Sequence, residues 1–340
     1  MVSDSVLYAG FAVVVTVLLA IDLFVVNRHA HAVSMKEAAV WSAIWVGCAV
    51  LFGLFVSRLH EGIEGENPTV AFFTGYVIEK SLSIDNLFLF LLIFGAMAVP
   101  KELQHRVLFY GVVGAIVMRT VLIFTGAALI ERFDWILYIF GAFLIYTGIQ
   151  TWLQRHEHPD ITNSRPMKAL QRILPTTDGY RGQHFFVKEN GKRLATPMFF
   201  VLVLVEFTDL IFAMDSIPAV FAVTRDPFIV LTSNIFAILG LRALYFLLAG
   251  LAAKLRYLKA GLAVILTYVG IKLCYERLHH DVEALHSWPG INPLVSLAVI
   301  IGILTITIIA SARNPLPPGE IAPSGVGPFE THKDHHHKKS

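Results

Sequence analysis

Three carboxylates lie within one strongly apolar stretch of the chain, VEFTDLIFAMDSIPAV at residues 205–220. The stretch EKSLSIDNLF at residues 79–88 resembles it, because in both a carboxylate is followed six residues later by Asp and a small polar residue. An Asp at the centre of a membrane helix costs about 2.5–3.5 kcal/mol. These acids must therefore be protonated, paired with a base or bound to a cation. The acids in apolar stretches are Asp22, Glu79, Asp85, Glu206, Asp209 and Asp215.

The neutral polar side chains beside these acids are also oxygen donors. All fourteen histidines fall in expected loops, at span ends or in the tail, and neither CxxC nor HExxH occurs. Hard oxygen ligands suit Mg²⁺, Ca²⁺ or Mn²⁺ rather than zinc or copper, and the chemistry leaves the choice among these three open. The predicted metal ligands are Glu79, Asp85, Asn86, Glu206, Asp209, Asp215 and Ser216, with Thr208, Asp22, Arg119 and Arg242 as accessory candidates.

Helical geometry sets a condition on this site. Glu206 and Asp209 are three residues apart and share a helix face, whereas six residues rotate Asp215 by roughly 240° from Asp209. Both can face one ion only if the helix is broken, and Pro218 favours such a break. We therefore expect discontinuous helices whose freed carbonyl groups add oxygen ligands.

Two arginines, Arg119 and Arg242, each lie in the middle of an apolar stretch. They could neutralise the acids when no metal is bound, or orient helices by bonding to backbone carbonyls. For Asp22, an ion pair between helices and a place in the metal site are equally compatible with the sequence.

Composition places these residues in a membrane. The chain has 340 residues, of which 56% are hydrophobic and 15% charged, and its mean hydropathy is +0.65. Because the apolar runs do not alternate with polar residues, helices rather than barrel strands are expected, and the fold is all-α. A net charge of +2 gives no indication of nucleic-acid binding. The nine predicted spans are 6–26, 38–57, 69–98, 106–129, 134–153, 198–222, 228–252, 257–275 and 291–311.

Basic residues set the expected orientation. With the N-terminus outside, the loops on the inner side carry most of the Lys and Arg, as the positive-inside rule requires. The outer loops then carry single basic residues, namely Arg58, Arg132, Arg225 and Arg277. The predicted topology has the N-terminus outside and the C-terminus inside.

Two groups of three spans resemble each other. Arg119 and Arg242 occupy matching positions, and the next spans share the pattern LxYxGI at residues 144–149 and 266–271. Because three is odd, the second copy would cross in the opposite direction, which is the inverted repeat of many secondary transporters. The predicted units are two helices in 6–57, a first repeat in 69–153, a cytosolic loop in 154–197 with a hairpin at Asn190-Gly191, an inverted second repeat in 198–275, a last helix in 291–311 and a disordered, His-containing tail in 312–340.

Over residues 10–311 the sequence resembles the TerC family, named for tellurite resistance. The motifs EKSLSIDNLFLF (79–90), ENGKRLATP (189–197) and the long block at 205–250 carry the resemblance. It implies a bacterial inner-membrane protein, in which the orientation expected from the basic residues makes the N-terminus periplasmic and the C-terminus cytoplasmic. The resemblance also favours Mn²⁺ among the hard cations.

The expected function is secondary transport that exports Mn²⁺ from the cytoplasm with coupling to protons. The ion is the transported substrate, and no cofactor is expected. A membrane scaffold that supports metallation or maintenance of envelope proteins is the alternative, and a homo-oligomer is compatible with both. The chain is not expected to be an enzyme, because it lacks the GxGD and HExxH motifs of intramembrane proteases.

Overall fold

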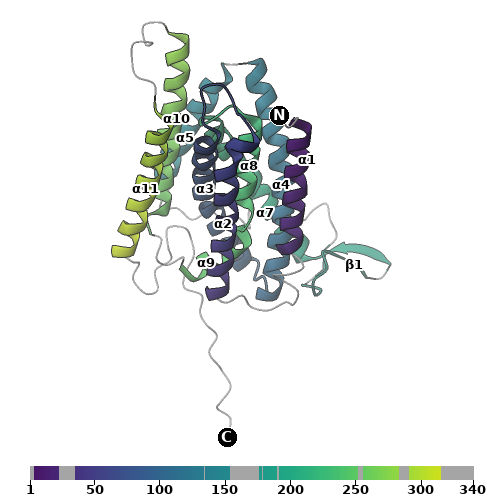
Figure 1. The fold of residues 1–340 in the computed structure, drawn as a ribbon. Coiled ribbons are helices and arrows are strands. Elements are labelled where there is room, and N and C mark those ends of the chain that lie inside the picture. Colours follow the sequence, from purple (N-terminus) through teal and green to yellow (C-terminus); the bar gives the residue numbers. More distant parts are fainter. Residues whose placement is uncertain are drawn as a thin grey trace.

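The computed structural model describes residues 4–22, 35–133, 135–153, 176–177, 179–189, 191–251, 256–282 and 291–314. Most of the predicted 154–197 loop and of the 312–340 tail lies outside these residues. Figure 1 shows long helices side by side in one bundle and a hairpin at one end of it. The described elements are α1 (Asp4–Ile21), α2 (Met35–Leu59), α3 (Pro68–Ala96), α4 (Lys101–Arg132), α5 (Ile136–Leu153), β1 (Phe186–Glu189), β2 (Lys192–Ala195), α7 (Pro197–Phe221), α8 (Pro227–Ile238), α9 (Leu241–Leu251), α10 (Leu258–Asp281) and α11 (Pro293–Arg313).

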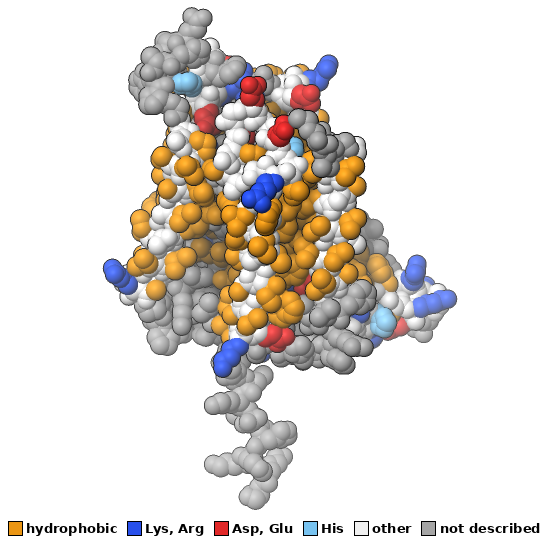
Figure 2. All heavy atoms as spheres, viewed as in Figure 1, with side chains coloured by type: hydrophobic (Ala, Val, Ile, Leu, Met, Phe, Trp, Pro, Cys, Tyr) orange, Lys and Arg blue, Asp and Glu red, His pale blue; other side chains and the backbone are white. Residues whose placement is uncertain are grey.

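The expected all-α membrane fold is confirmed. By length and composition, six described helices can cross a membrane, namely α2, α4, α5, α7, α10 and α11. The bent pair α8 and α9 would make a seventh span. Helix α3 is long enough at 29 residues, but Glu79, Lys80 and Asp85 interrupt its apolar character. In Figure 2 apolar side chains cover most of the middle of the visible face, and charged groups gather mainly toward its ends.

The expected span 228–252 consists of two helices, α8 and α9, with a bend in its middle. Helix α8 ends at Ile238, α9 begins at Leu241, and the two axes differ by 42°. Gly240 takes a positive φ of 80°, and a Cβ there would lie 2.6 Å from the Trp45 ring of α2. Glycine therefore permits both the turn and the close approach of α2.

The breaks expected within the two acidic spans are wrong. Helix α7 is continuous through Pro218 to Phe221, and α3 is continuous from Pro68 to Ala96. Pro218 lies in the last turn of α7, so the hydrogen bond that proline removes does not divide the helix. On an unbroken helix, the six-residue separation places Asp209 and Asp215 on different faces.

Helices α5 and α10 approach each other closely at small residues. A Cβ built at Gly148 would lie 2.8 Å from the Thr267 backbone nitrogen and 2.9 Å from the Ala263 carbonyl oxygen. A Cβ at Gly270 would lie 2.8 Å from the Gly141 carbonyl oxygen. Glycine at these positions lets the two backbones touch, as in many helix pairs within membranes.

We expect Gly148→Ala to lower the free energy of unfolding by about 1–3 kcal/mol, because its methyl group would meet backbone atoms of α10 that cannot rotate away. Gly302→Ala on α11 is the matched control, since nothing lies within 4 Å of a Cβ at that position. The midpoint of thermal unfolding in detergent measures both effects. Equal midpoints for the two variants would contradict the close approach of α5 and α10.

The predicted hairpin is present next to α7. Strands β1 and β2 pair antiparallel, with Phe186 opposite Ala195 and Glu189 opposite Lys192. Gly191 takes a positive φ of 77°, as expected in a tight turn. Only Thr196 separates the hairpin from the first residue of α7.

Candidate functional site

Arg119 of α4 lies at the centre of a buried polar cluster. Its side chain is wholly enclosed by protein and binds Asp209 of α7 through two parallel hydrogen bonds, Nε to Oδ2 at 3.0 Å and Nη2 to Oδ1 at 2.9 Å. Its Nη1 donates to Glu79 of α3 in a second ion pair. One guanidinium therefore compensates two carboxylates from two other helices, and the bidentate contact is the strong form of such a pair.

Helix α8 contributes the fourth side of this cluster through Asn234. The Asn234 amide donates from Nδ2 to Oε2 of Glu79 at 2.9 Å, and its Oδ1 accepts from Nη1 of Arg119 at 3.3 Å. Asn234 is fully buried. Both ends of the amide are thus satisfied, which fixes the orientation of the Glu79 carboxylate against α8.

Two further oxygen donors border the same carboxylates. The Ser216 hydroxyl accepts from Nη1 of Arg119 at 3.2 Å, and Asn86 donates from Nδ2 to Oδ1 of Asp209 at 3.4 Å. The Asn86 Oδ1 atom is buried and has no hydrogen-bond partner among the described residues. A buried carbonyl oxygen without a donor is costly, so a cation or a proton donor at this position would be favourable.

The structure brings together four of the predicted ligands, namely Glu79, Asn86, Asp209 and Ser216. Glu206 is half-buried and lies one turn from Asp209 along α7, with its carboxylate against Gly114 of α4. Asp215 is half-buried and has no hydrogen-bond partner among the described residues. Asp85 belongs to α3, but its side chain lies outside the described part of the structure.

Some of the predicted accessory residues lie at the Arg119 cluster and others lie elsewhere. Thr208 is buried next to Asp209 in the α7 sequence. Arg242 instead binds Asp22, donating from Nη2 to Oδ1 at 2.5 Å and to the backbone carbonyl at 2.9 Å. Thus Arg119 neutralises acids, whereas Arg242 combines an ion pair with a carbonyl contact.

Two carboxylates and several neutral oxygens make up the described site. Among the described residues, no three His, Cys, Asp or Glu side chains form a group that could hold a metal ion. The Arg119 guanidinium occupies the space between Glu79 and Asp209. A metal ion could bind these oxygens only after Arg119 withdraws, because two cations in one buried cluster would repel each other.

Sequence reasoning missed two side chains at the contact between α3 and α8. Asn234 is uncharged and lies in an apolar stretch, so only its polarity within FIVLTSNIFAI sets it apart. Lys80 of α3 donates from Nζ to the carbonyl oxygen of Ala237 at 3.0 Å, next to the break between α8 and α9. A lysine beside Glu79 in an apolar stretch was the available signal for its importance.

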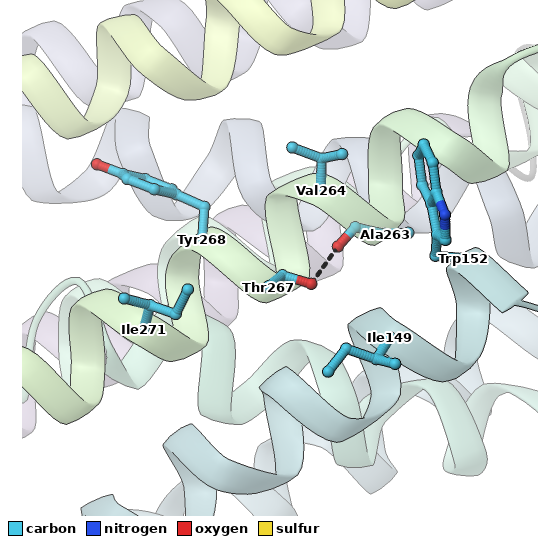
Figure 3. A pocket seen from close by; sticks show the side chains of 7 residues that line it. All are labelled: Ile149, Trp152, Ala263, Val264, Thr267, Tyr268 and Ile271. Carbon is cyan, nitrogen blue, oxygen red and sulfur yellow. Dashed lines mark hydrogen bonds between the residues drawn. The ribbon is translucent and has the colours of Figure 1, made fainter.

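A pocket of about 440 Å³ lies apart from this chemistry, between α5 and α10. Figure 3 shows Ile149 and Trp152 on one side and Val264, Tyr268 and Ile271 on the other. Its Thr267 hydroxyl already donates to the Ala263 carbonyl at 2.8 Å. None of its lining residues is ionisable at neutral pH, so the pocket does not suit an ion.

The fold and the buried cluster define a polytopic helical membrane protein with an ion-paired centre. A family model described as "Integral membrane protein TerC family" matches residues 64–315. The chain belongs to this family.

Curated relatives extend the similarity over almost the whole chain. A protein of Escherichia coli K12 named "Putative membrane-bound redox modulator Alx" is 50% identical over 316 residues, which cover 92% of this chain and 95% of the relative. A Myxococcus xanthus protein named "Uncharacterized membrane protein STKORF319" is 48% identical over 305 residues, covering 90% and 91%. A Rickettsia bellii membrane protein is 40% identical over 301 residues, covering 88% and 95%. No solved structure matches the chain.

Proposed function

We propose that this protein is a secondary transporter that exports Mn²⁺ from the cytoplasm across the bacterial inner membrane. The observation that carries the proposal is the enclosed Arg119 guanidinium, which holds Glu79 and Asp209 together from three helices of a membrane protein. Ionisable groups at such positions are costly and mark ion pathways. Here the arginine acts as the resident cation of the site when no metal is bound.

Charge balance supports a divalent substrate. With both carboxylates ionised, Arg119 leaves the cluster of Glu79, Asp209 and itself with a formal charge of −1. A divalent cation in place of the guanidinium would neutralise both carboxylates. Binding of the metal and withdrawal of Arg119 are therefore coupled in one exchange. In the metal-free state, a bound proton neutralises the remaining negative charge of the cluster.

The donor set supports a hard cation. The oxygens around the guanidinium come from two carboxylates, the Asn86 and Asn234 amides and the Ser216 hydroxyl. Oxygen-rich sites of this kind suit Mn²⁺, Mg²⁺ and Ca²⁺, and the family resemblance favours Mn²⁺ among them. Asp215 lies outside this proposed centre, and Glu206 is one turn nearer the hairpin end of α7, where it would receive the ion on its way in.

The proposed chain has nine spans, and the packing of α5 against α10 supports an inverted repeat among them. Gly148 of α5 meets Thr267 and Ala263 of α10, and Gly270 of α10 meets Ile145 and Gly141 of α5. In the alignment of the two LxYxGI patterns, Gly148 corresponds to Gly270. The contact of Gly148 with α10 is therefore equivalent to the contact of Gly270 with α5. Transport sites in such folds lie where the repeats meet, and the Arg119 cluster joins helices of both halves.

The test is Mn²⁺ flux in proteoliposomes that contain the purified full-length protein. With manganese inside the vesicles and an imposed pH gradient, the wild type should release Mn²⁺ faster than empty vesicles, and reversal of the gradient should change the rate. Flux equal to that of empty vesicles under every gradient would exclude transport and favour a scaffold.

The name of the Escherichia coli relative includes redox modulation, which directs attention to the two cysteines of this chain. Cys48 of α2 and Cys274 of α10 are both free thiols. If the protein acts by ion transport, Cys48→Ser/Cys274→Ser should keep Mn²⁺ flux within about twofold of the wild type, because neither thiol belongs to the Arg119 cluster. Loss of function in the double variant with unchanged thermal unfolding would instead indicate thiol chemistry.

A further inference from the structure

The hairpin carries two like charges on one face. The register places Lys188 of β1 directly opposite Arg193 of β2, and both side chains are exposed. Directly opposed residues of an antiparallel pair share a face, and like charges there are destabilising. Neither side chain has an acidic partner among the described residues, so no described carboxylate neutralises this face.

The opposite face of the same hairpin carries a carboxylate that meets two cations. Glu189 lies opposite Lys192, and Arg181 donates from Nε to Oε1 of Glu189 at 2.8 Å. The two opposed cations without a described carboxylate beside them therefore belong to one face only. That face also carries Phe186, which is 47% exposed, two residues before Lys188.

The hairpin is anchored at the end of the membrane-spanning bundle. The Phe186 ring lies 4.6 Å from the Phe199 ring in the first turn of α7. Tyr180 donates to the Met97 carbonyl at 2.8 Å, and Arg106 of α4 donates to Gln183 at 2.8 Å. Figure 1 shows the strands projecting sideways from the helix bundle, and Figure 2 shows Lys and Arg side chains on this projection.

We propose that the face carrying Phe186, Lys188 and Arg193 binds the phosphate groups of anionic phospholipids in the leaflet beside α7. A sideways projection at the end of a spanning helix lies over the lipids next to the bundle. Phe186 would enter the boundary of the acyl chains, while the two cations meet phosphate oxygens, a combination typical of interfacial segments.

Lipid suits this face better than nucleic acid or an acidic protein. The net charge of the chain is only +2, so no broad basic field extends beyond the patch. The exposed aromatic ring also adjoins a spanning helix, where hydrocarbon is the nearest solvent. The inference does not depend on the identity of the transported ion.

Native mass spectrometry of the full-length protein with added dioleoyl phosphatidylglycerol or dioleoyl phosphatidylcholine tests the proposal. The wild type should bind phosphatidylglycerol more tightly, because each basic residue near an anionic membrane contributes to attraction. Lys188→Gln/Arg193→Gln should weaken phosphatidylglycerol binding about 10- to 30-fold and leave phosphatidylcholine binding unchanged. Thermal unfolding of each variant confirms that the bundle remains folded.

The matched control is Lys101→Gln/Lys192→Gln, which removes the same charge at the same end of the molecule but spares the proposed face. Its phosphatidylglycerol affinity should change less than twofold. The proposal would be overturned if the wild type showed no headgroup preference, or if the two double variants lost equal phosphatidylglycerol affinity. It would also be overturned if the protein bound a short RNA or a poly-glutamate peptide through Lys188 and Arg193 without preferring phosphatidylglycerol.

Discussion

Replacement of Arg119 by Gln should make the stability of the protein depend on manganese. The substitution leaves Glu79 and Asp209 buried without their shared cation, and removal of one partner from a buried ion pair costs about 3–5 kcal/mol. Mn²⁺ could then enter the vacated space without competition. At a concentration near 100 times its Kd, a ligand that binds only the folded state stabilises it by about 2.7 kcal/mol.

Thermal unfolding in detergent, with and without Mn²⁺, measures this effect. Arg242→Gln is the matched control, because it also breaks a buried arginine–aspartate pair, with Asp22, but outside the cluster. Both variants should unfold at lower temperature than the wild type, and only Arg119→Gln should recover on addition of Mn²⁺. Equal recovery of stability in both variants would show that Arg119 does not occupy the ion site. Flux through Arg119→Gln should be lost, since nothing displaces the bound metal.

Asp209→Asn should reduce Mn²⁺ flux about 10- to 100-fold, because hydrogen bonds to charged groups contribute roughly 1.5–3 kcal/mol. The amide keeps the shape of the side chain but removes one of the two negative charges that would neutralise a divalent ion. It also removes the acceptor for one of the two parallel bonds from Arg119, so the guanidinium loses its fixed position.

Asp215→Asn is the internal control for this second prediction. Asp215 lies six residues along the same continuous helix and outside the Arg119 cluster, so its flux should stay within about threefold of the wild type. Initial rates over a range of Mn²⁺ concentrations separate weaker binding from slower transport. If Asp215→Asn lowers flux as far as Asp209→Asn, the ion path includes both faces of α7, and the cluster is only part of the site.

Simple energetic rules predicted the membrane helices and part of the site from sequence. Apolar runs near 20 residues indicated the spans, and the cost of buried charge singled out Glu79, Asp209 and Arg119. The pairing of these residues was open, because Arg119 and Arg242 look alike in sequence. Which acid each arginine meets depends on helix packing, and the structure places Asp22 beside Arg242.

Other features depend on contacts between distant parts of the chain. The break after Ile238 involves Gly240 packed under Trp45 of α2, a contact that local sequence does not contain. Asn234 could not be distinguished from an ordinary polar residue until Glu79 lay beside it. Pro218 was misleading, because the effect of a proline depends on its distance from the helix end, and α7 ends three residues later.

Adjacent residues of α3 hold α8 at two successive points. Glu79 binds the Asn234 amide at 2.9 Å, and Lys80 binds the Ala237 carbonyl at 3.0 Å, where the helix breaks. A movement of α8 away from α3 would have to break both contacts at once. We therefore expect α3 and α8 to behave as the fixed wall of the ion path. The movable wall is then α4, whose long arginine side chain can swing away without unfolding any helix.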